Sequence, residues 1–157
     1  MLEPRIDNKK ITIKELINQL ENTFVPMDVD PEQASVVFEV VLLGVTPFKP
    51  FIYSNDNQNY TYVNCKHELS SLYNICKNKI KLTNLKFYDR YNSLYFKDLP
   101  KGVQRYFNNI EITYSFMCLK IPNEKFETLQ KISKYQLNIL DNAEKIKLLG
   151  DSKENDW

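Results

Sequence analysis

The stretch DVDPEQASVVFEVVLLGV, residues 28–45, decides how the chain folds, because its pattern suits either a helix or a strand. Its many valines favour a strand. Against this, Asp30 suits the cap before a helix, Pro31 the first helical position and Gly44 the position after the last turn. Its polar residues share one narrow helical stripe: Glu32, Ser35 and Glu39. The balance favours a largely buried helix over residues 31–43, with a strand as the alternative.

The segment before this stretch carries a full set of helix-start signals. Thr12 can cap a helix, and Glu15 stands three residues later, which is the capping-box pattern. Apolar residues then follow at helical spacing and predict a buried stripe: Ile13, Leu16, Ile17 and Leu20. We therefore expect a helix that ends near Phe24.

The segment after residue 45 predicts a hairpin, a helix, a second hairpin and a strand. Phe51–Tyr53 and Tyr60–Val63 flank turn-forming residues, which is typical of a β-hairpin. His67–Ile80 places apolar residues at helical spacing, and Ile110–Phe116 alternates as a strand does. Leu85–Asp98 is expected to form the second hairpin, with its turn at residues 90–93.

The C-terminal part predicts a helix over residues 124–149, which would be about 39 Å long at 1.5 Å per residue. This helix has two apolar strips. Both can lie against the sheet, or one can pair with a second copy of the chain, giving a homodimer, or with another protein. Residues 1–10 and 151–157 are expected to be flexible tails.

Together these elements predict one α+β domain over residues 1–157. Its antiparallel sheet would be built from hairpins and packed against an N-terminal helix, a central helix and the long C-terminal helix.

Composition and charge restrict the function classes. A hydrophobic content of 43% and a charged content of 26% are typical of a soluble globular protein. The net charge of +1 is that of neither a strongly basic nucleic-acid binder nor an acidic mimic. Charge is nevertheless uneven: acids dominate between Lys14 and Asp56, and bases dominate between Lys66 and Arg105.

Cellular location and source are also indicated by the sequence. The start resembles no secretory signal, the longest apolar run is too short for a membrane span, and the three cysteines form no CxxC pair. We therefore expect a cytoplasmic protein without a membrane partner. Abundant Asn, Lys, Ile and Tyr with scarce Gly indicate an A/T-rich genome.

No motif for catalysis, cofactor binding or metal binding stands out, and no cofactor is expected. Gly44, Gly102 and Gly150 are isolated, which excludes a P-loop and a dinucleotide fingerprint. His67 is the only histidine, and a zinc site built from it and two of the cysteines would need an acid as well. Glu39 is a candidate buried acid, for which solvation or pairing with lysine is the simpler interpretation.

The second predicted hairpin mixes aromatic and basic residues. Strand alternation would place one set in the core: Leu85, Phe87, Leu94 and Phe96. The other face would be basic and aromatic. A short helix after Asp98 would turn Leu99, Val103 and Phe107 inward. The candidate binding residues are Lys86, Tyr88, Arg90, Tyr95, Lys97, Lys101 and Arg105.

Three hypotheses for the function follow. The first is a non-enzymatic interaction protein, an inhibitor or accessory factor of a phage or mobile element, which binds a host or viral macromolecule, with a protein as the favoured partner. The second is a single-stranded nucleic-acid binder, because rings stack on bases and cations neutralise phosphates. The third is a small enzyme that uses a cysteine or His67.

Overall fold

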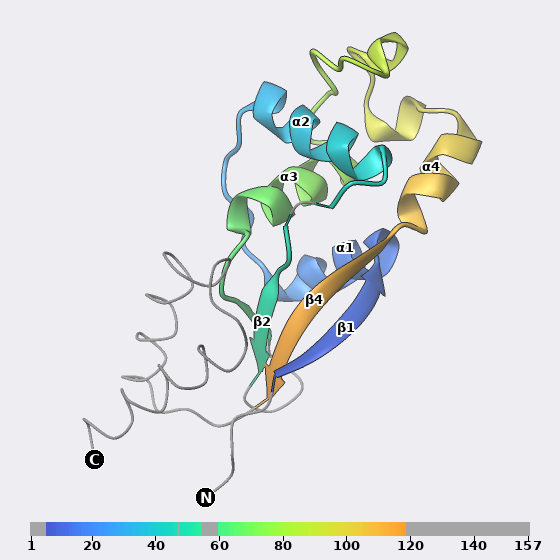
Figure 1. The fold of residues 1–157 in the computed structure, drawn as a ribbon. Coiled ribbons are helices and arrows are strands. Elements are labelled where there is room, and N and C mark those ends of the chain that lie inside the picture. The colour runs from blue at the N-terminus through green and yellow to red at the C-terminus, as the bar shows by residue number, and fades with distance from the viewer. Residues whose placement is uncertain (1–5, 47, 55–59, 119–157) are drawn as a thin grey trace, which may run out of the picture. The chain divides into compact units, whose positions relative to one another are not determined.

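The computed structural model describes residues 6–46, 48–54 and 60–118, and it shows an α+β fold. The described residues contain four helices and one mixed four-stranded sheet (Figure 1). The described residues divide into two compact units, the first made of residues 6–9, 49–54, 60–64 and 113–118 and the second of residues 10–46, 48 and 65–112. The helix predicted over residues 124–149 and the predicted tail 151–157 lie outside the described residues.

The sheet has the strand order β1-β4-β2-β3. Its strands are β1 (Ile6–Thr12), β2 (Phe51–Ser54), β3 (Tyr60–Tyr62) and β4 (Glu111–Cys118). β2 and β3 pair antiparallel, which confirms the first hairpin. β2 and β4 pair parallel, so the prediction of an antiparallel sheet built from hairpins was wrong. Parallel strands need a long crossover connection, which the chain between β3 and β4 supplies. Residues 6–10, predicted as part of a flexible tail, belong to β1.

Helix α1 (Ile13–Thr23) begins as its sequence predicts. The Glu15 amide donates to the Thr12 hydroxyl oxygen at 3.2 Å, and the Thr12 hydroxyl donates to the Glu15 carboxylate at 2.8 Å. The predicted apolar stripe is buried: Ile13, Leu16, Ile17 and Leu20.

Helix α2 (Pro31–Leu42) confirms the helical interpretation of the opening stretch. The Gln33 amide donates to the Asp30 carboxylate at 3.1 Å and so caps the start of the helix. The buried apolar residues are Ala34, Phe38, Val41 and Leu42. Their burial on one helical face outweighs the strand propensity of the valines.

A left-handed glycine ends α2. Gly44 has φ +88°, and its amide donates to the Val41 carbonyl at 2.9 Å. The Val45 amide donates to the Val40 carbonyl at 3.0 Å, which completes a Schellman motif. This motif places Val45 beside Val40.

Aromatic rings pack α2 against α4 (Lys101–Asn108) in the second unit, which also contains α3 (Lys66–Cys76). Phe38 of α2 stacks on Phe107 of α4, with 4.4 Å between the ring centroids. Phe96 meets both rings steeply, at 6.3 and 5.8 Å. Helices α2 and α3 also pack side by side (Figure 1).

The second predicted hairpin does not form. Residues 85–98 run instead through turns and two single-turn 3-10 helices, η1 (Asp89–Tyr91) and η2 (Phe96–Asp98). Phe96 is buried as predicted, but Phe87 is 70% exposed, so its assignment to the core was wrong. The short helix predicted after Asp98 does form, as α4.

Gly44, which ends α2, and Gly102, which lies inside α4, give a matched test of the left-handed conformation at the end of α2. We expect Gly44→Ala to lower the free energy of unfolding by about 1 kcal/mol, because a Cβ is disfavoured at positive φ. Gly102 in α4 is the control, because an added Cβ meets no atom within 4 Å there. Gly102→Ala should be neutral or stabilise by up to about 1 kcal/mol. Urea denaturation measures the free energy of unfolding of both variants. An equal decrease in the two variants would contradict the role of Gly44 as the left-handed end of α2.

Candidate interaction surface

The polar stripe of α2 fastens the segment 83–88 to the helix. The Thr83 amide donates to the Ser35 hydroxyl oxygen at 3.0 Å. The Asn84 side-chain amide donates to the Glu32 carboxylate. Because these contacts come from successive turns of α2, the segment runs along the helix. We call residues 83–88 the pinned segment.

Glu39 provides the strongest of these attachments. Its side chain is buried, and Oε1 accepts a hydrogen bond from the Lys86 amide at 2.9 Å. Oε2 accepts from the amides of Phe87 and Tyr88 at 2.8 and 3.0 Å. A buried carboxylate needs such charge-assisted hydrogen bonds. The interpretation of Glu39 as solvated or paired with lysine was wrong, because its partners are backbone amides.

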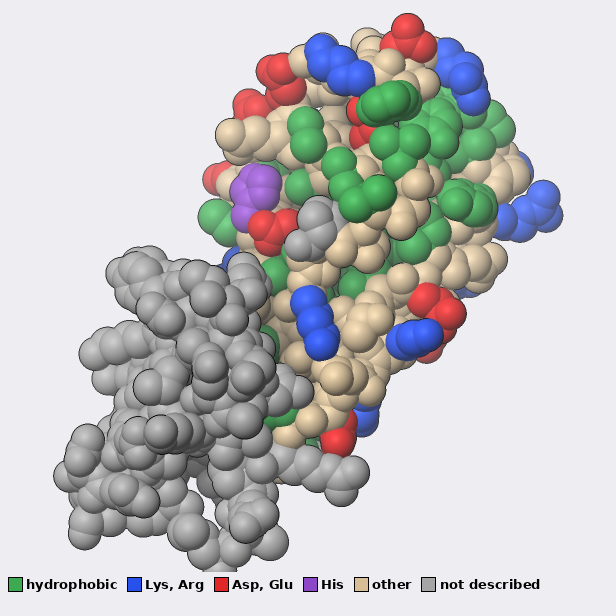
Figure 2. Space-filling model, viewed as in Figure 1, with side chains coloured by type: hydrophobic (Ala, Val, Ile, Leu, Met, Phe, Trp, Pro, Cys, Tyr) green, Lys and Arg blue, Asp and Glu red, His purple; other side chains and the backbone are tan. Residues whose placement is uncertain are grey.

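Phe87 projects into solvent from this fixed backbone, and its amide is held by Glu39 of α2. Val36, Val40 and Leu43 lie at neighbouring helical positions, next to Glu39. Val36 is 56% exposed and Leu43 is 42% exposed. Figure 2 shows hydrophobic side chains gathered over the region that α2 and the pinned segment occupy. We define the apolar patch as Val36, Val40, Leu43, Val45 and Phe87.

The α2 part of the apolar patch has no exposed charge. Between Gln33 and Thr46 the one charged residue is Glu39, which is buried. Charges of both signs stand beside Phe87 in the chain: Lys86, Asp89 and Arg90, all exposed. An apolar centre with a polar rim is typical of a protein-binding site.

Three predicted binding residues, Lys86, Tyr88 and Arg90, lie on or next to the pinned segment. The Tyr88 and Tyr91 rings are nearly parallel, with centroids 6.0 Å apart. The Arg90 guanidinium lies 4.7 Å from the Tyr91 centroid and 5.8 Å from that of Tyr88. These rings therefore pack on each other and on Arg90, and they do not form the predicted sheet face.

The other four predicted residues lie on η2 and α4 or next to them. Lys97 Nζ is 5.6 Å from the Tyr95 ring centroid, and Lys81 Nζ is 5.3 Å from it. Lys101 and Arg105 are exposed one turn apart on α4. Among the described residues, no cation–ring contact links this group to Arg90 and its tyrosines. The structure thus divides the predicted site in two.

Sequence reasoning missed two exposed rings. Phe87 was assigned to the core by strand alternation, which does not apply because no strand forms. Tyr106 is 58% exposed beside Arg105. Its outward position follows from the helical spacing of the buried Phe107, so that signal was present in the sequence.

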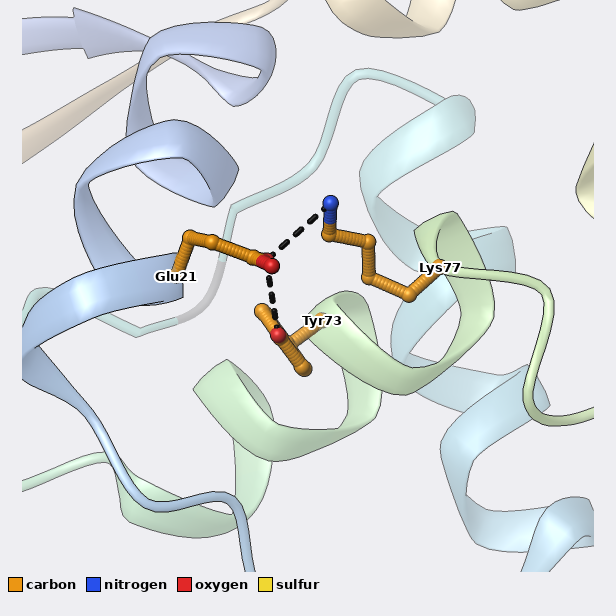
Figure 3. Close-up of polar contacts among 3 residues, drawn as sticks. All are labelled: Glu21, Tyr73 and Lys77. Carbon is orange, nitrogen blue, oxygen red and sulfur yellow. Dashed lines mark hydrogen bonds and ion pairs between the residues drawn. The ribbon is translucent and has the colours of Figure 1, made fainter.

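A cluster of Glu21, Tyr73 and Lys77 ties α1 to α3 (Figure 3). The Tyr73 hydroxyl donates to Glu21 Oε2 at 2.7 Å, and Lys77 Nζ lies 3.0 Å from the same oxygen. The hydrogen bonds from Tyr73 and Lys77 lower the pKa of Glu21, whereas the bond to Glu21 raises the pKa of Tyr73. A raised pKa makes Tyr73 a poor candidate for proton transfer at neutral pH, so the cluster is structural.

Cys76, one of the groups named in the enzyme hypothesis, is not activated as a nucleophile. Burial raises the pKa of Cys76 to about 12, which leaves little thiolate at neutral pH. His67 lies in the first turn of α3, where its Nε2 is buried without a hydrogen-bond partner. The described part of the chain contains no group of three or more His, Cys, Asp or Glu residues that could hold a metal ion. None of its helices is long and apolar enough to cross a membrane.

Substitution of Glu39 tests the attachment of the pinned segment. We expect Glu39→Ala to lower the free energy of unfolding by about 2–4 kcal/mol, because three amides lose a charged acceptor. Glu39→Gln should cost less because it keeps one acceptor oxygen. Glu32→Gln, at an exposed position of the same stripe, should stay within about 0.5 kcal/mol. Urea denaturation measures stability, and hydrogen exchange at the amides of residues 86–88 should accelerate. A similar loss for the alanine variant and Glu32→Gln would rule out this role.

The Glu21 cluster predicts a pH dependence. Because the folded pKa lies below the ordinary value of 4.5, Glu21 stabilises the fold above pH 4.5, and this contribution is lost as the pH falls below it. The stability difference between wild type and Glu21→Gln should therefore shrink between pH 7 and pH 3 in urea titrations. In a Tyr73→Phe background the difference should already be smaller at pH 7. A difference that grows on acidification would refute the assignment.

Comparison of the chain with protein-family models, with curated proteins and with solved structures finds no significant match. The function must therefore be argued from the surface itself.

Proposed function

We propose that this protein is a non-enzymatic interaction protein that binds another protein through the apolar patch. The observation that carries the proposal is the exposed ring of Phe87 on a backbone that the buried Glu39 holds in place. Beside it lies the uncharged aliphatic face of α2. A soluble protein gains nothing in stability by exposing these side chains together, whereas a partner gains by covering them.

Burial of the apolar patch supplies a binding free energy of useful size. Covering a Val, Leu or Phe side chain completely contributes roughly 1.5–3 kcal/mol. The patch residues are already partly buried, so each contributes less than this. The rigid attachment of the pinned segment lowers the entropy lost when Phe87 is immobilised by a partner. Phe87 is the expected anchor, because it is the largest and most exposed member of the patch.

The chemistry of the patch favours a protein over a polyanion. Aliphatic side chains such as Val36 and Leu43 neither stack on bases nor bind phosphates. The charged neighbours of Phe87 are of both signs, Lys86, Asp89 and Arg90, so the rim of the patch is mixed and not uniformly basic. A protein surface with an apolar centre and a mixed polar rim fits better.

An inhibitor or accessory factor of a phage or mobile element is the class of protein that we propose. Such a protein acts by occupying a surface of its target and needs no catalytic set. The amino-acid composition of the chain, which indicates an A/T-rich genome, agrees with that source.

Site-specific photo-crosslinking tests this proposal. Phe87 is replaced by p-benzoylphenylalanine, and the full chain is irradiated in the cells that produce it. Val25, which is 91% exposed in the same unit, is the control position. We expect a discrete protein adduct from position 87 that is absent from position 25. Adding Val36→Lys should abolish the adduct without unfolding the chain.

Other outcomes decide against the proposal. Equal adducts from positions 87 and 25 would show unspecific exposure. No adduct from position 87 would leave the apolar patch without a partner. An adduct that nuclease removes and protease leaves intact would support the nucleic-acid hypothesis instead.

A further inference from the structure

The part of the chain that contains the second group of basic residues has a large excess of positive charge. Between positions 77 and 105 the chain has eight basic residues and two acids, a net charge of 8 − 2 = +6. The bases are Lys77, Lys79, Lys81, Lys86, Arg90, Lys97, Lys101 and Arg105. Unbalanced charge of this density attracts anions.

Few of these cations are paired with a carboxylate in the described part of the chain. Glu21 is occupied by Lys77 and Tyr73. Asp98 accepts a hydrogen bond from the Tyr95 amide at 3.3 Å, as the cap of η2. Among the described residues, Lys77 is the one member of the basic group with an ion pair to a carboxylate. The remaining cations are available to an external anion.

Hydrogen bonds fix the basic elements next to one another within the second unit. The Lys97 amide donates to the side-chain carbonyl of Asn78, just after α3, at 2.8 Å. The Gln104 side-chain amide of α4 donates to the Lys97 carbonyl at 3.1 Å. Since Lys81 and Lys97 also share the ring of Tyr95, these cations lie on connected elements.

The exposed face of α4 combines charge with an accessible ring. Lys101 and Arg105 form one row at i and i+4, and Gly102 and Tyr106 form the next row. An added Cβ at Gly102 would meet no atom within 4 Å, so the helix surface beside Tyr106 is open. Figure 2 shows Lys and Arg side chains projecting at the edge where Figure 1 places α4.

We infer that this surface binds single-stranded nucleic acid without sequence preference, independently of the apolar patch. Its residues are Lys81, Lys97, Lys101, Arg105 and Tyr106. The cations contact phosphates, and the Tyr106 ring stacks with one base, which must be unpaired to reach it. Tyr95 has two lysines at its ring and is half-buried, so Tyr106 is the stacking residue.

Fluorescence anisotropy with a mixed-sequence 12-nucleotide single strand tests the inference on the full chain at 50 and 200 mM salt. We expect the triple variant Lys97→Glu/Lys101→Glu/Arg105→Glu to lower the affinity at least tenfold. The slope of log K against log salt should fall by about 2, at roughly 0.7 for each phosphate contact. The control is Lys10→Glu/Lys14→Glu/Lys66→Glu, with the same charge change at exposed lysines on other elements. It should keep most of the affinity.

Substitution of Tyr106, whose ring is exposed, tests the same surface without changing its charge. Tyr106→Ala should weaken binding on the order of tenfold, whereas Tyr106→Phe should retain it. Thermal melting checks that each variant is folded. If the triple variant is unfolded, the comparison of Tyr106→Ala with Tyr106→Phe tests the inference.

Several outcomes would overturn the inference. These are no binding by wild type at 50 mM salt, equal losses in the two triple variants, and tighter binding of a duplex of the same length. Polyglutamate that binds as well as the oligonucleotide would indicate an acidic protein ligand. Loss of oligonucleotide binding in Phe87→Ala would assign the nucleic acid to the apolar patch. A failed crosslink at position 87 with intact oligonucleotide binding would refute the proposed function alone.

Discussion

The buried carboxylate of Glu39 is the interaction on which the described surface depends. Its two oxygens accept the amides of three consecutive residues, 86–88, which have no strand partner. Unsatisfied amides at this depth are costly, so the carboxylate decides the path of the segment along α2. That path turns Phe87 outward, next to the aliphatic face of the same helix. A buried contact thereby organises an exposed surface.

The two surfaces of the second unit differ in the chemistry they offer. The apolar patch has no exposed charge along α2 and presents aliphatic side chains with one rigid phenylalanine. The basic surface presents cations on connected elements and the open ring of Tyr106. The first suits a protein and the second a nucleic acid, because apolar burial and phosphate neutralisation need different residues. Under both proposals the chain joins a protein to a nucleic acid, as an accessory factor does.

Capping residues near the ends of helices predicted α1 and α2 from the sequence. Thr12 with Glu15 marked α1, and Asp30 with Gly44 marked α2, because caps satisfy amides and carbonyls close in sequence. The hairpin of β2 and β3 was predicted from the turn-forming residues between its two strand segments. Residues 85–98 were misread, since an alternating pattern indicates a strand only when another strand supplies the hydrogen bonds. Here Glu39, 47 to 49 positions away in the chain, supplies them.

The sequence by itself determined the helix α1, the α+β class, the basic character of the region after α3 and the residue types of the candidate site, and it favoured a helix for α2. The tertiary structure alone decided that the sheet is mixed, that Phe87 is exposed and that the predicted binding residues form two groups. Capping and periodicity act within a few residues, so they can be read along the chain. Strand pairing, and the choice of partner for a buried carboxylate, depend on groups that are distant in sequence and become neighbours only in the folded protein.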